Sequence, residues 1–309
     1  MRAVIIADRL GHELWPLTDR RPVSLLPIAN KPLVQIALEE LYDLGIKSGT
    51  IISCSQAGKV SNELGNGSRF GMKVHHVEVD RPVNVKAALD IAHIHHNEDW
   101  LAVRGDMLRP LGFIGEALAR VGHAVGSEIF TAMGIATGSS QHGTCQDLSW
   151  ENVREACRLH PVTIDTLRCY LDANIMALKG LVPGIRLPGR TTPDQIVVGP
   201  DSRVACRQAP HRAVTIGARC LIHRTTVLDK GTVIGSDTIV DRGARLEQTI
   251  VLPGSHVGRN QHLIGVIVDG TRVICPQTGA IVGDTLRPSK RHARLPNNDD
   301  RNTVTHVCF

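Results

Sequence analysis

The chain has 309 residues, of which 42% are hydrophobic and 21% are charged, and this composition argues against long disorder and predicts two domains. A net charge of +5 with only 3% aromatic residues disfavours a nucleic-acid-binding surface. No apolar run reaches the roughly 20 residues that span a bilayer, and no signal peptide is recognisable at the start of the sequence. We therefore expect a cytoplasmic protein with no nucleic acid partner and no membrane insertion.

Strand-like and helix-like segments alternate in the first half of the chain. Short apolar runs predict strands at residues 2–7, 50–54, 73–79 and 100–103. Helical spacing of apolar residues predicts helices at 33–44, 56–64, 83–94, 111–121 and 164–178. Because this alternation is typical of parallel sheets, residues 1–190 are predicted to form a Rossmann-like α/β domain. Ligands of such sheets bind beyond the carboxyl ends of the strands, here after Ala7 and Val103.

A six-residue period replaces this alternation from residue 198. Positions six apart are aliphatic in all but one case: Val198, Val204, Pro210, Ile216, Ile222, Leu228, Ile234, Val240, Leu246 and Leu252. The period slips after Val257 and resumes through Leu263, Val268 and Val273. The pattern is typical of a hexapeptide-repeat parallel β-helix, predicted here as left-handed, in which each hexad supplies one short strand and one corner. We predict the β-helix at residues 191–285 and a basic tail at 286–309.

Outward positions of the predicted β-helix carry further apolar residues. The residue before each inward aliphatic points outward, and residues 18 apart share a face. This predicts an exposed apolar ladder of Leu221, Ile239 and Val257 and a shorter one of Val233 and Val251. Since a ladder of exposed aliphatics indicates contact, we expect it to pack on the N-terminal domain, on a second copy of the chain in a homo-oligomer, or on a partner protein.

A long motif opens the chain. Residues 3–18 read AVIIADRLGHELWPLT, and residues 21–33 read RPVSLLPIANKPL. They resemble the opening signature of the sugar-1-phosphate nucleotidyltransferases, or NDP-sugar pyrophosphorylases. The mannose-1-phosphate guanylyltransferase type, which also carries a left-handed β-helix, is the most similar. Residues 64–71 (LGNGSRFG) resemble the family stretch LGDGSxFG, and residues 100–108 (WLAVRGDML) resemble its strand FLVxNGDxL.

The resemblance implies a reaction and a set of site residues. A nucleoside triphosphate and a sugar 1-phosphate would give an NDP-sugar and pyrophosphate, with Mg²⁺ held by Asp106. The family's opening loop supplies an Arg and a later Lys that neutralise the phosphates. In this chain Gly11 is kept, but the Arg corresponds to Glu13 and the Lys to Val23. An anion near the triphosphate repels it by about 1 kcal/mol at 4 Å in water. The sequence therefore predicts impaired catalysis.

Other residues are candidates for nucleotide binding, and no catalytic residue is assigned with them. The candidates are Ala7, Arg9, Gly11, Lys31 and Lys86, of which Arg9, Lys31 and Lys86 are replacement cations. The histidines His93, His95 and His96 favour an exposed helix end over a metal site. Eight scattered cysteines with no C-x-x-C pair do not support a zinc ribbon.

Three functions stay open on these grounds. The first is a catalytically impaired pyrophosphorylase homologue that regulates, scaffolds or binds nucleotide sugars in polysaccharide synthesis. The second is an active nucleotidyltransferase that makes an NDP-sugar such as GDP-mannose and needs Mg²⁺. The third is a β-helix acyltransferase, whose histidine base would come from His211, His223, His256 or His262.

Overall fold

The chain divides into two compact units. A computed structural model describes residues 1–95, 98–116, 135–138, 161–192, 196–205 and 213–286. The first unit contains residues 1–27, 31–165 and 182–185, and the second contains residues 28–30, 166–181 and 186–309. The domain boundary expected at residue 190 stays a prediction.

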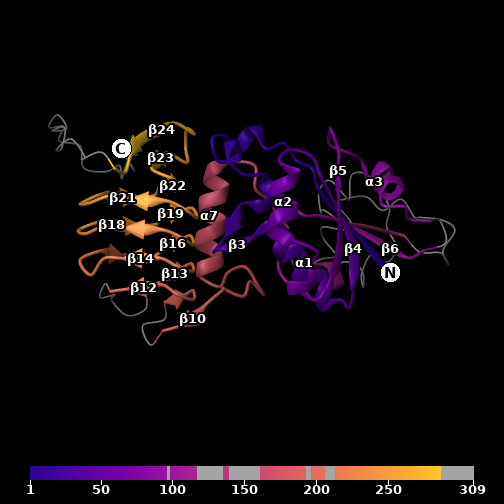
Figure 1. The fold of residues 1–309 in the computed structure, drawn as a ribbon, viewed down its shortest axis with the longest axis horizontal. Helices are drawn as coiled ribbons and strands as arrows, with labels where there is room; N and C mark the ends of the chain where they lie inside the picture. The colour runs from indigo at the N-terminus through magenta and orange to yellow at the C-terminus, as the bar shows by residue number, and fades with distance from the viewer. Residues whose placement is uncertain (96–97, 117–134, 139–160, 193–195, 206–212, 287–309) are drawn as a thin grey trace. The chain divides into compact units, whose positions relative to one another are not determined.

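A five-stranded sheet with the order β5-β4-β1-β6-β8 forms the centre of the first unit (Figure 1). Its strands are β1 (Arg2–Ala7), β4 (Ser48–Ser53), β5 (Lys73–Glu78), β6 (Trp100–Arg104) and β8 (Ile135–Gly138). The first four are parallel, and β8 runs antiparallel to β6. Because β1 pairs directly with β6, the carboxyl ends of these two strands, at Ala7 and Arg104, lie side by side.

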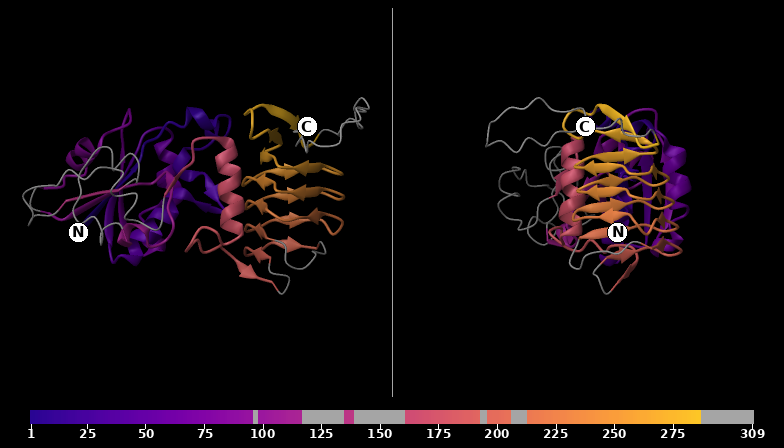
Figure 2. Two further views of the ribbon diagram at one scale, coloured as in Figure 1. Left: turned by 180° about the vertical axis from the view of Figure 1, so that it is seen from behind. Right: turned by 90° about the vertical axis from the view of Figure 1, so that its left-hand side faces the viewer.

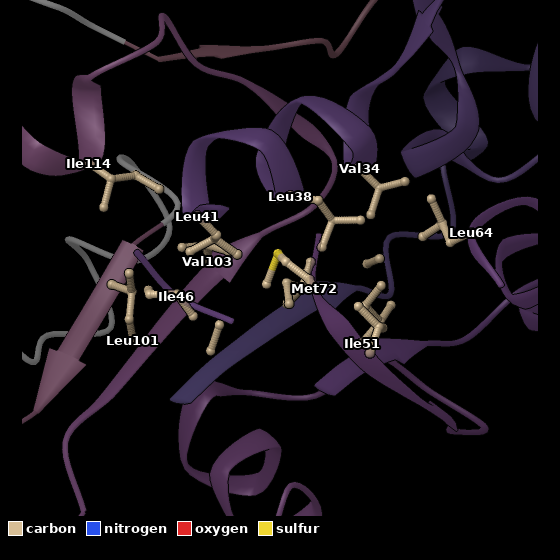
Figure 3. Close-up of a cluster of buried hydrophobic side chains, with 14 of the residues drawn as sticks. Val34, Leu38, Leu41, Ile46, Ile51, Leu64, Met72, Leu101, Val103 and Ile114 are labelled. Carbon is tan, nitrogen blue, oxygen red and sulfur yellow. The ribbon is translucent and has the colours of Figure 1, made fainter. Parts of the chain in front are cut away.

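Helices cover both faces of this sheet, as the alternation of elements predicts. They are α1 (Leu33–Asp43), α2 (Ala57–Leu64) and α3 (Val85–Ile91). Val34 of α1 and Leu64 of α2 belong to the same buried cluster as Val103 of the sheet (Figure 3). Ala88 of α3 belongs to a second cluster, which contains Ile6 of β1. Adjacent residues of a strand point to opposite faces, so each face of the sheet has its own core.

Short elements connect these strands and helices. They are η1 (His12–Leu14), η2 (Leu17–Asp19), η3 (Val23–Leu25), β2 (Pro27–Ile28), β3 (Lys31–Pro32), η4 (Ser68–Phe70), β7 (Met107–Leu108) and β9 (Val162–Thr163). The helix expected at 83–94 begins only at Val85, because the Asn84 side chain caps it by accepting a hydrogen bond from the Ala87 N–H at 2.9 Å. Of the helix expected at 111–121, residues 111–112 form a turn, residues 113–116 are helical, and residues 117–121 lie outside the described residues.

Short strands stack into coils in the second unit (Figure 2). Three ladders follow the stack: β11-β13-β16-β19-β22, β12-β14-β17-β20 and β15-β18-β21. The strands are β10 (Arg190–Thr191), β11 (Val197–Val198), β12 (Arg203–Val204), β13 (Val214–Ile216), β14 (Leu221–Ile222), β15 (Val227–Leu228), β16 (Thr232–Ile234), β17 (Ile239–Val240), β18 (Arg245–Glu247), β19 (Ile250–Val251), β20 (His256–Val257), β21 (His262–Ile264), β22 (Ile267–Asp269), β23 (Arg272–Ile274) and β24 (Ile281–Asp284). The predicted fold class, an α/β domain followed by a hexapeptide β-helix, is confirmed.

Helix α7 (Leu167–Leu178) runs along the stacked coils of the second unit (Figure 2). It begins after Thr166, whose side chain accepts a hydrogen bond from the Cys169 N–H at 3.0 Å. A Cβ placed on Gly231 would lie 3.5 Å from Cγ1 of Ile175, so this turn of the β-helix contacts the helix. None of the helices in the described part of the chain has the length and apolar character needed to cross a bilayer.

The coils of the β-helix change length part-way along the stack. Ile216 aligns with Ile234 at a spacing of 18 residues, whereas Ile234 aligns with Val251 at 17. Gln248, at the shortened corner, has a φ of 47°, a left-handed conformation that a non-glycine residue adopts at some energetic expense. Val251 therefore joins the inner core in place of Leu252, which is a correction to the predicted register.

This change in register corrects the predicted apolar ladder. Leu221 and Ile239 are aligned and are 46% and 41% exposed, as predicted. The next residue of that row is His256, because Val257 aligns with Val240 and is buried in the inner core. Val251 is likewise an inward residue, and Val233 is buried on the outer face of its ladder. The exposed ladder is thus limited to the first two residues.

Candidate functional site

Three charged residues meet where β1 and β6 end. Nε of Arg104 donates to Oδ1 of Asp106 at 2.8 Å, and Nη2 donates to Oδ2 of the same carboxylate at 2.6 Å. Nη2 also donates to Oδ1 of Asp8 at 3.2 Å. Asp106 is 0% exposed and Asp8 is 1% exposed. A guanidinium that bridges two buried carboxylates in this way forms strong, charge-assisted hydrogen bonds.

Burial and charge pairing have opposite effects on the pKa values of Asp8 and Arg104. Burial raises the pKa of Asp8, although a hydrogen bond from the Val83 N–H and the charge of Arg104 oppose the rise. Burial by itself lowers the pKa of Arg104, but its hydrogen bonds and charge interactions with Asp106 and Asp8 outweigh that effect and raise the pKa. These interactions therefore favour the charged form of Arg104.

The opening loop packs tightly after β1. Gly11 has a φ of 74°, a left-handed conformation that favours glycine. A Cβ at this position would lie 2.4 Å from Cγ2 of Val23, so the glycine is also required for space. Val23 is completely buried, and the hydroxyl of Thr18 donates to the Gly11 carbonyl at 2.8 Å. Val23 thus fills the space beneath the loop rather than facing a ligand.

Arg9 and Glu13 form an ion pair within this loop. Nη2 of Arg9 lies 2.5 Å from Oε1 of Glu13, and their side chains are 18% and 39% exposed. The same nitrogen donates to the Ile164 carbonyl at 2.7 Å. The anion and the replacement cation predicted from the sequence are therefore brought together, and each neutralises the other.

The two other predicted cations differ in their surroundings. Lys31 is 5% exposed, and its Nζ lies 2.6 Å from Oε2 of Glu39. Lys86 lies in the first turn of α3 and is exposed. Of the predicted binding residues, Ala7, Arg9 and Gly11 lie on one continuous segment that leads out of β1.

A buried ion pair next to Lys31 was not predicted from the sequence. Nε of Arg109 lies 3.4 Å from Oε2 of Glu40, and the two side chains are 1% and 2% exposed. Burial raises the pKa of Glu40 and lowers that of Arg109, and the attraction between them opposes both shifts. Nη1 and Nη2 of Arg109 have no hydrogen-bond partner in the described part of the chain, and the adjoining cavity of about 10 Å³ is large enough for one water.

Asp106, the predicted metal ligand, does not fit a magnesium site. Mg²⁺ is normally bound by one or two carboxylates that leave room for several waters. Both oxygens of Asp106 instead accept hydrogen bonds from Arg104, and the side chain is shielded from solvent. Among the described residues, no three His, Cys, Asp or Glu side chains are grouped closely enough to hold a metal ion.

The histidines singled out from the sequence lie in several places. His93 follows α3 with a φ of 50°, and His96 lies outside the described residues. On the β-helix, Nε2 of His256 lies 3.2 Å from Oδ2 of Asp241. His223 and His262 are exposed, and residue 211 lies outside the described residues. Acyl transfer by such a histidine stays a prediction.

Two family models match the chain. Residues 2–110 match the model described as nucleotidyl transferase. This part of the chain is therefore similar to nucleotidyl transferases. Residues 197–296 match the model described as GlmU-like, C-terminal hexapeptide, which agrees with the stacked coils of the second unit.

Curated relatives match parts of the chain. Glucose-1-phosphate thymidylyltransferase of Streptomyces antibioticus is 32% identical over 107 residues, or 34% of this chain and 30% of that protein. The enzyme of the same name from Mycolicibacterium smegmatis is 33% identical over 132 residues, or 42% of this chain and 46% of that protein. N-acetylmuramate alpha-1-phosphate uridylyltransferase of Neisseria meningitidis serogroup B is 29% identical over 116 residues, or 37% and 50%. The chain thus spans half or less of each of these relatives.

These relatives refine the resemblance stated from the sequence. The similarity holds at the level of sugar-1-phosphate nucleotidyltransferases with a hexapeptide C-terminal region. Thymidylyl- and uridylyltransferases are among the matches, so the mannose-1-phosphate guanylyltransferase type is not singled out.

Proposed function

We propose that this nucleotidyltransferase homologue is impaired in nucleotidyl transfer and acts as a regulatory or scaffolding protein that binds nucleotide sugars in polysaccharide synthesis. The observation that carries the proposal is the ion pair between Arg9 and Glu13, with Nη2 and Oε1 2.5 Å apart. Catalysis of phosphoryl-type transfer depends on positioned cations that neutralise developing charge. A cation that is already neutralised within its own loop supplies little of this stabilisation.

The other positions support the same proposal. Val23 is buried beneath Gly11 and offers no charge. Lys31, which lies in the adjoining segment, is already paired with Glu39 at 2.6 Å. Lys86, exposed in the first turn of α3, is the candidate cation that we assign to the phosphates of a bound nucleotide sugar. One exposed lysine suits binding of a diphosphate better than catalysis on a triphosphate.

A second candidate function is active nucleotidyl transfer with Mg²⁺. The match of residues 2–110 to the nucleotidyl transferase model and the similarity of parts of the chain to named thymidylyl- and uridylyltransferases favour it. In that case the nucleotide is a thymidine or uridine nucleotide or, as in the guanylyltransferase type, a guanosine nucleotide. Magnesium-dependent pyrophosphate release separates this function from the first.

Binding of nucleotide sugars tests the proposed function. Equilibrium dialysis with UDP-glucose, dTDP-glucose and GDP-mannose is expected to show saturable binding of at least one of them. Lys86→Ala is expected to weaken that binding. Lys73→Ala is the control: it removes an exposed lysine at the amino end of β5, away from the carboxyl ends of the strands, and is expected to leave the binding unchanged. Equal loss in both variants, or no binding by the wild type, would contradict the proposal.

A further inference from the structure

Arg104 occupies both oxygens of the carboxylate that the family resemblance assigns to the metal. Its Nε and Nη2 meet Oδ1 and Oδ2 of Asp106 at 2.8 and 2.6 Å. This is the planar, two-pronged geometry in which guanidinium matches carboxylate best, and a lysine does not reproduce it. In the motif FLVxNGDxL, which residues 100–108 resemble, an uncharged asparagine stands where this chain has Arg104.

The same guanidinium ties other loops to Asp106. Its Nη2 also lies 3.2 Å from Oδ1 of Asp8, and Oδ2 of Asp8 accepts a hydrogen bond from the Val83 N–H at 2.6 Å. Asp8 follows β1, Arg104 ends β6, and Val83 lies just before α3. One side chain therefore joins three segments at the carboxyl edge of the sheet, where a ligand of such a sheet binds.

A metal ion would have to displace this cation. Asp106 is 0% exposed and Asp8 is 1% exposed, so neither carboxylate has a free, hydrated side on which a divalent ion keeps its waters. Displacing Arg104 would break its three charge-assisted hydrogen bonds to these carboxylates, a loss that binding of the metal ion would have to offset. The positive charge that the two carboxylates need is already present in the chain.

We propose that Arg104 is a resident cation that takes the place of a divalent metal at Asp106 and Asp8, so that this site binds nucleotide sugars without Mg²⁺. The inference rests on the proposed function, because it concerns the same site. The inference excludes a metal ion at Asp106. The proposed function instead concerns turnover and the binding of nucleotide sugars.

Mn²⁺ binding, measured by the loss of the electron paramagnetic resonance signal of free Mn²⁺, tests this inference directly. The wild-type protein and Asp106→Asn are expected to bind Mn²⁺ equally weakly, with and without UDP-glucose. Arg104→Asn, which leaves two carboxylates without their cation, is expected to bind Mn²⁺ at least about tenfold more tightly than the wild type. Arg219→Asn is the matched control, because Arg219 forms a similar two-pronged pair with Asp237 on the exposed surface of the β-helix.

The comparison of the wild type with Asp106→Asn decides the inference even if Arg104→Asn does not fold. Arg104→Lys, which keeps a charge but not the fork, is then the second variant, and weak Mn²⁺ binding by it supports the inference. Mn²⁺ binding by the wild type that Asp106→Asn abolishes would overturn the inference while leaving the proposed function intact. Turnover that is unaffected by Asp106→Asn would contradict the proposed function while leaving the inference intact.

Discussion

Replacing Glu13 by Gln frees Arg9 while keeping the shape of the opening loop. The pair is partly exposed, so its attraction is worth about 0.2–1 kcal/mol, as for other surface pairs. Removing an anion that lies about 4 Å from a phosphate takes away a further repulsion of about 1 kcal/mol in water. A total of about 1–2 kcal/mol predicts that Glu13→Gln binds a nucleoside triphosphate roughly five- to thirtyfold more tightly than the wild type.

Fluorescence titration with labelled ATP, GTP, UTP and dTTP measures this change. Glu98→Gln is the control. Glu98 pairs at 3.2 Å with Arg2, which begins β1, so this pair lies at the end of β1 away from the opening loop. The side chains of Glu98 and Glu13 are similarly exposed, at 34% and 39%. Both variants change the net charge of the protein by the same amount. If the two variants bind triphosphates equally well, local repulsion by Glu13 is not the cause of weak binding, and the reasoning about the opening loop is wrong.

Three further predictions follow from burial. Val23→Lys places a charge beneath Gly11 in the core and is expected to lower the Tm by at least about 5 °C in a thermal melt; an unchanged Tm would show that the site is open. Val257→Asp is expected to lower the free energy of unfolding in urea by more than about 4 kcal/mol, whereas Leu221→Asp changes it by less than about 0.5 kcal/mol; equal effects would contradict the register. Burial raises the pKa of Asp8 above 3.8, so its contribution to stability is full below that value and is lost as the pH rises through the folded-state pKa. In urea unfolding at about pH 4 and pH 7, Asp8→Asn should therefore lose less stability with rising pH than the wild type; an equal or larger loss would contradict this assignment.

Local patterns were sufficient to predict the fold. The apolar runs that form β1 and β6 and the period of six that begins at Val198 depend on neighbouring residues alone, and the structure contains both features. The shortened coil was missed because the corner between Leu246 and Val251 has one residue fewer than the corner between Leu228 and Ile234, and no residue type in the sequence marks that loss. Without that information the period predicts Leu252 rather than Val251 in the core.

The site was predicted less well because its contacts join distant parts of the chain. Asp8 and Arg104 are 96 residues apart in sequence, and nothing local indicates that they meet. A signal was nevertheless present: opposite charges stand directly after one buried strand and at the end of another, and neighbouring parallel strands bring such ends together. The ion pair of Arg9 with Glu13 has the i,i+4 spacing and was open to prediction from the sequence as well.

Pyrophosphate release tests the central claim, impaired nucleotidyl transfer, most directly. The wild type and Asp106→Asn would be assayed with Mg²⁺, each common nucleoside triphosphate and a panel of sugar 1-phosphates, beside an active thymidylyltransferase. We predict that both proteins release pyrophosphate no faster than a blank without protein. Release by the wild type that Asp106→Asn abolishes would contradict it.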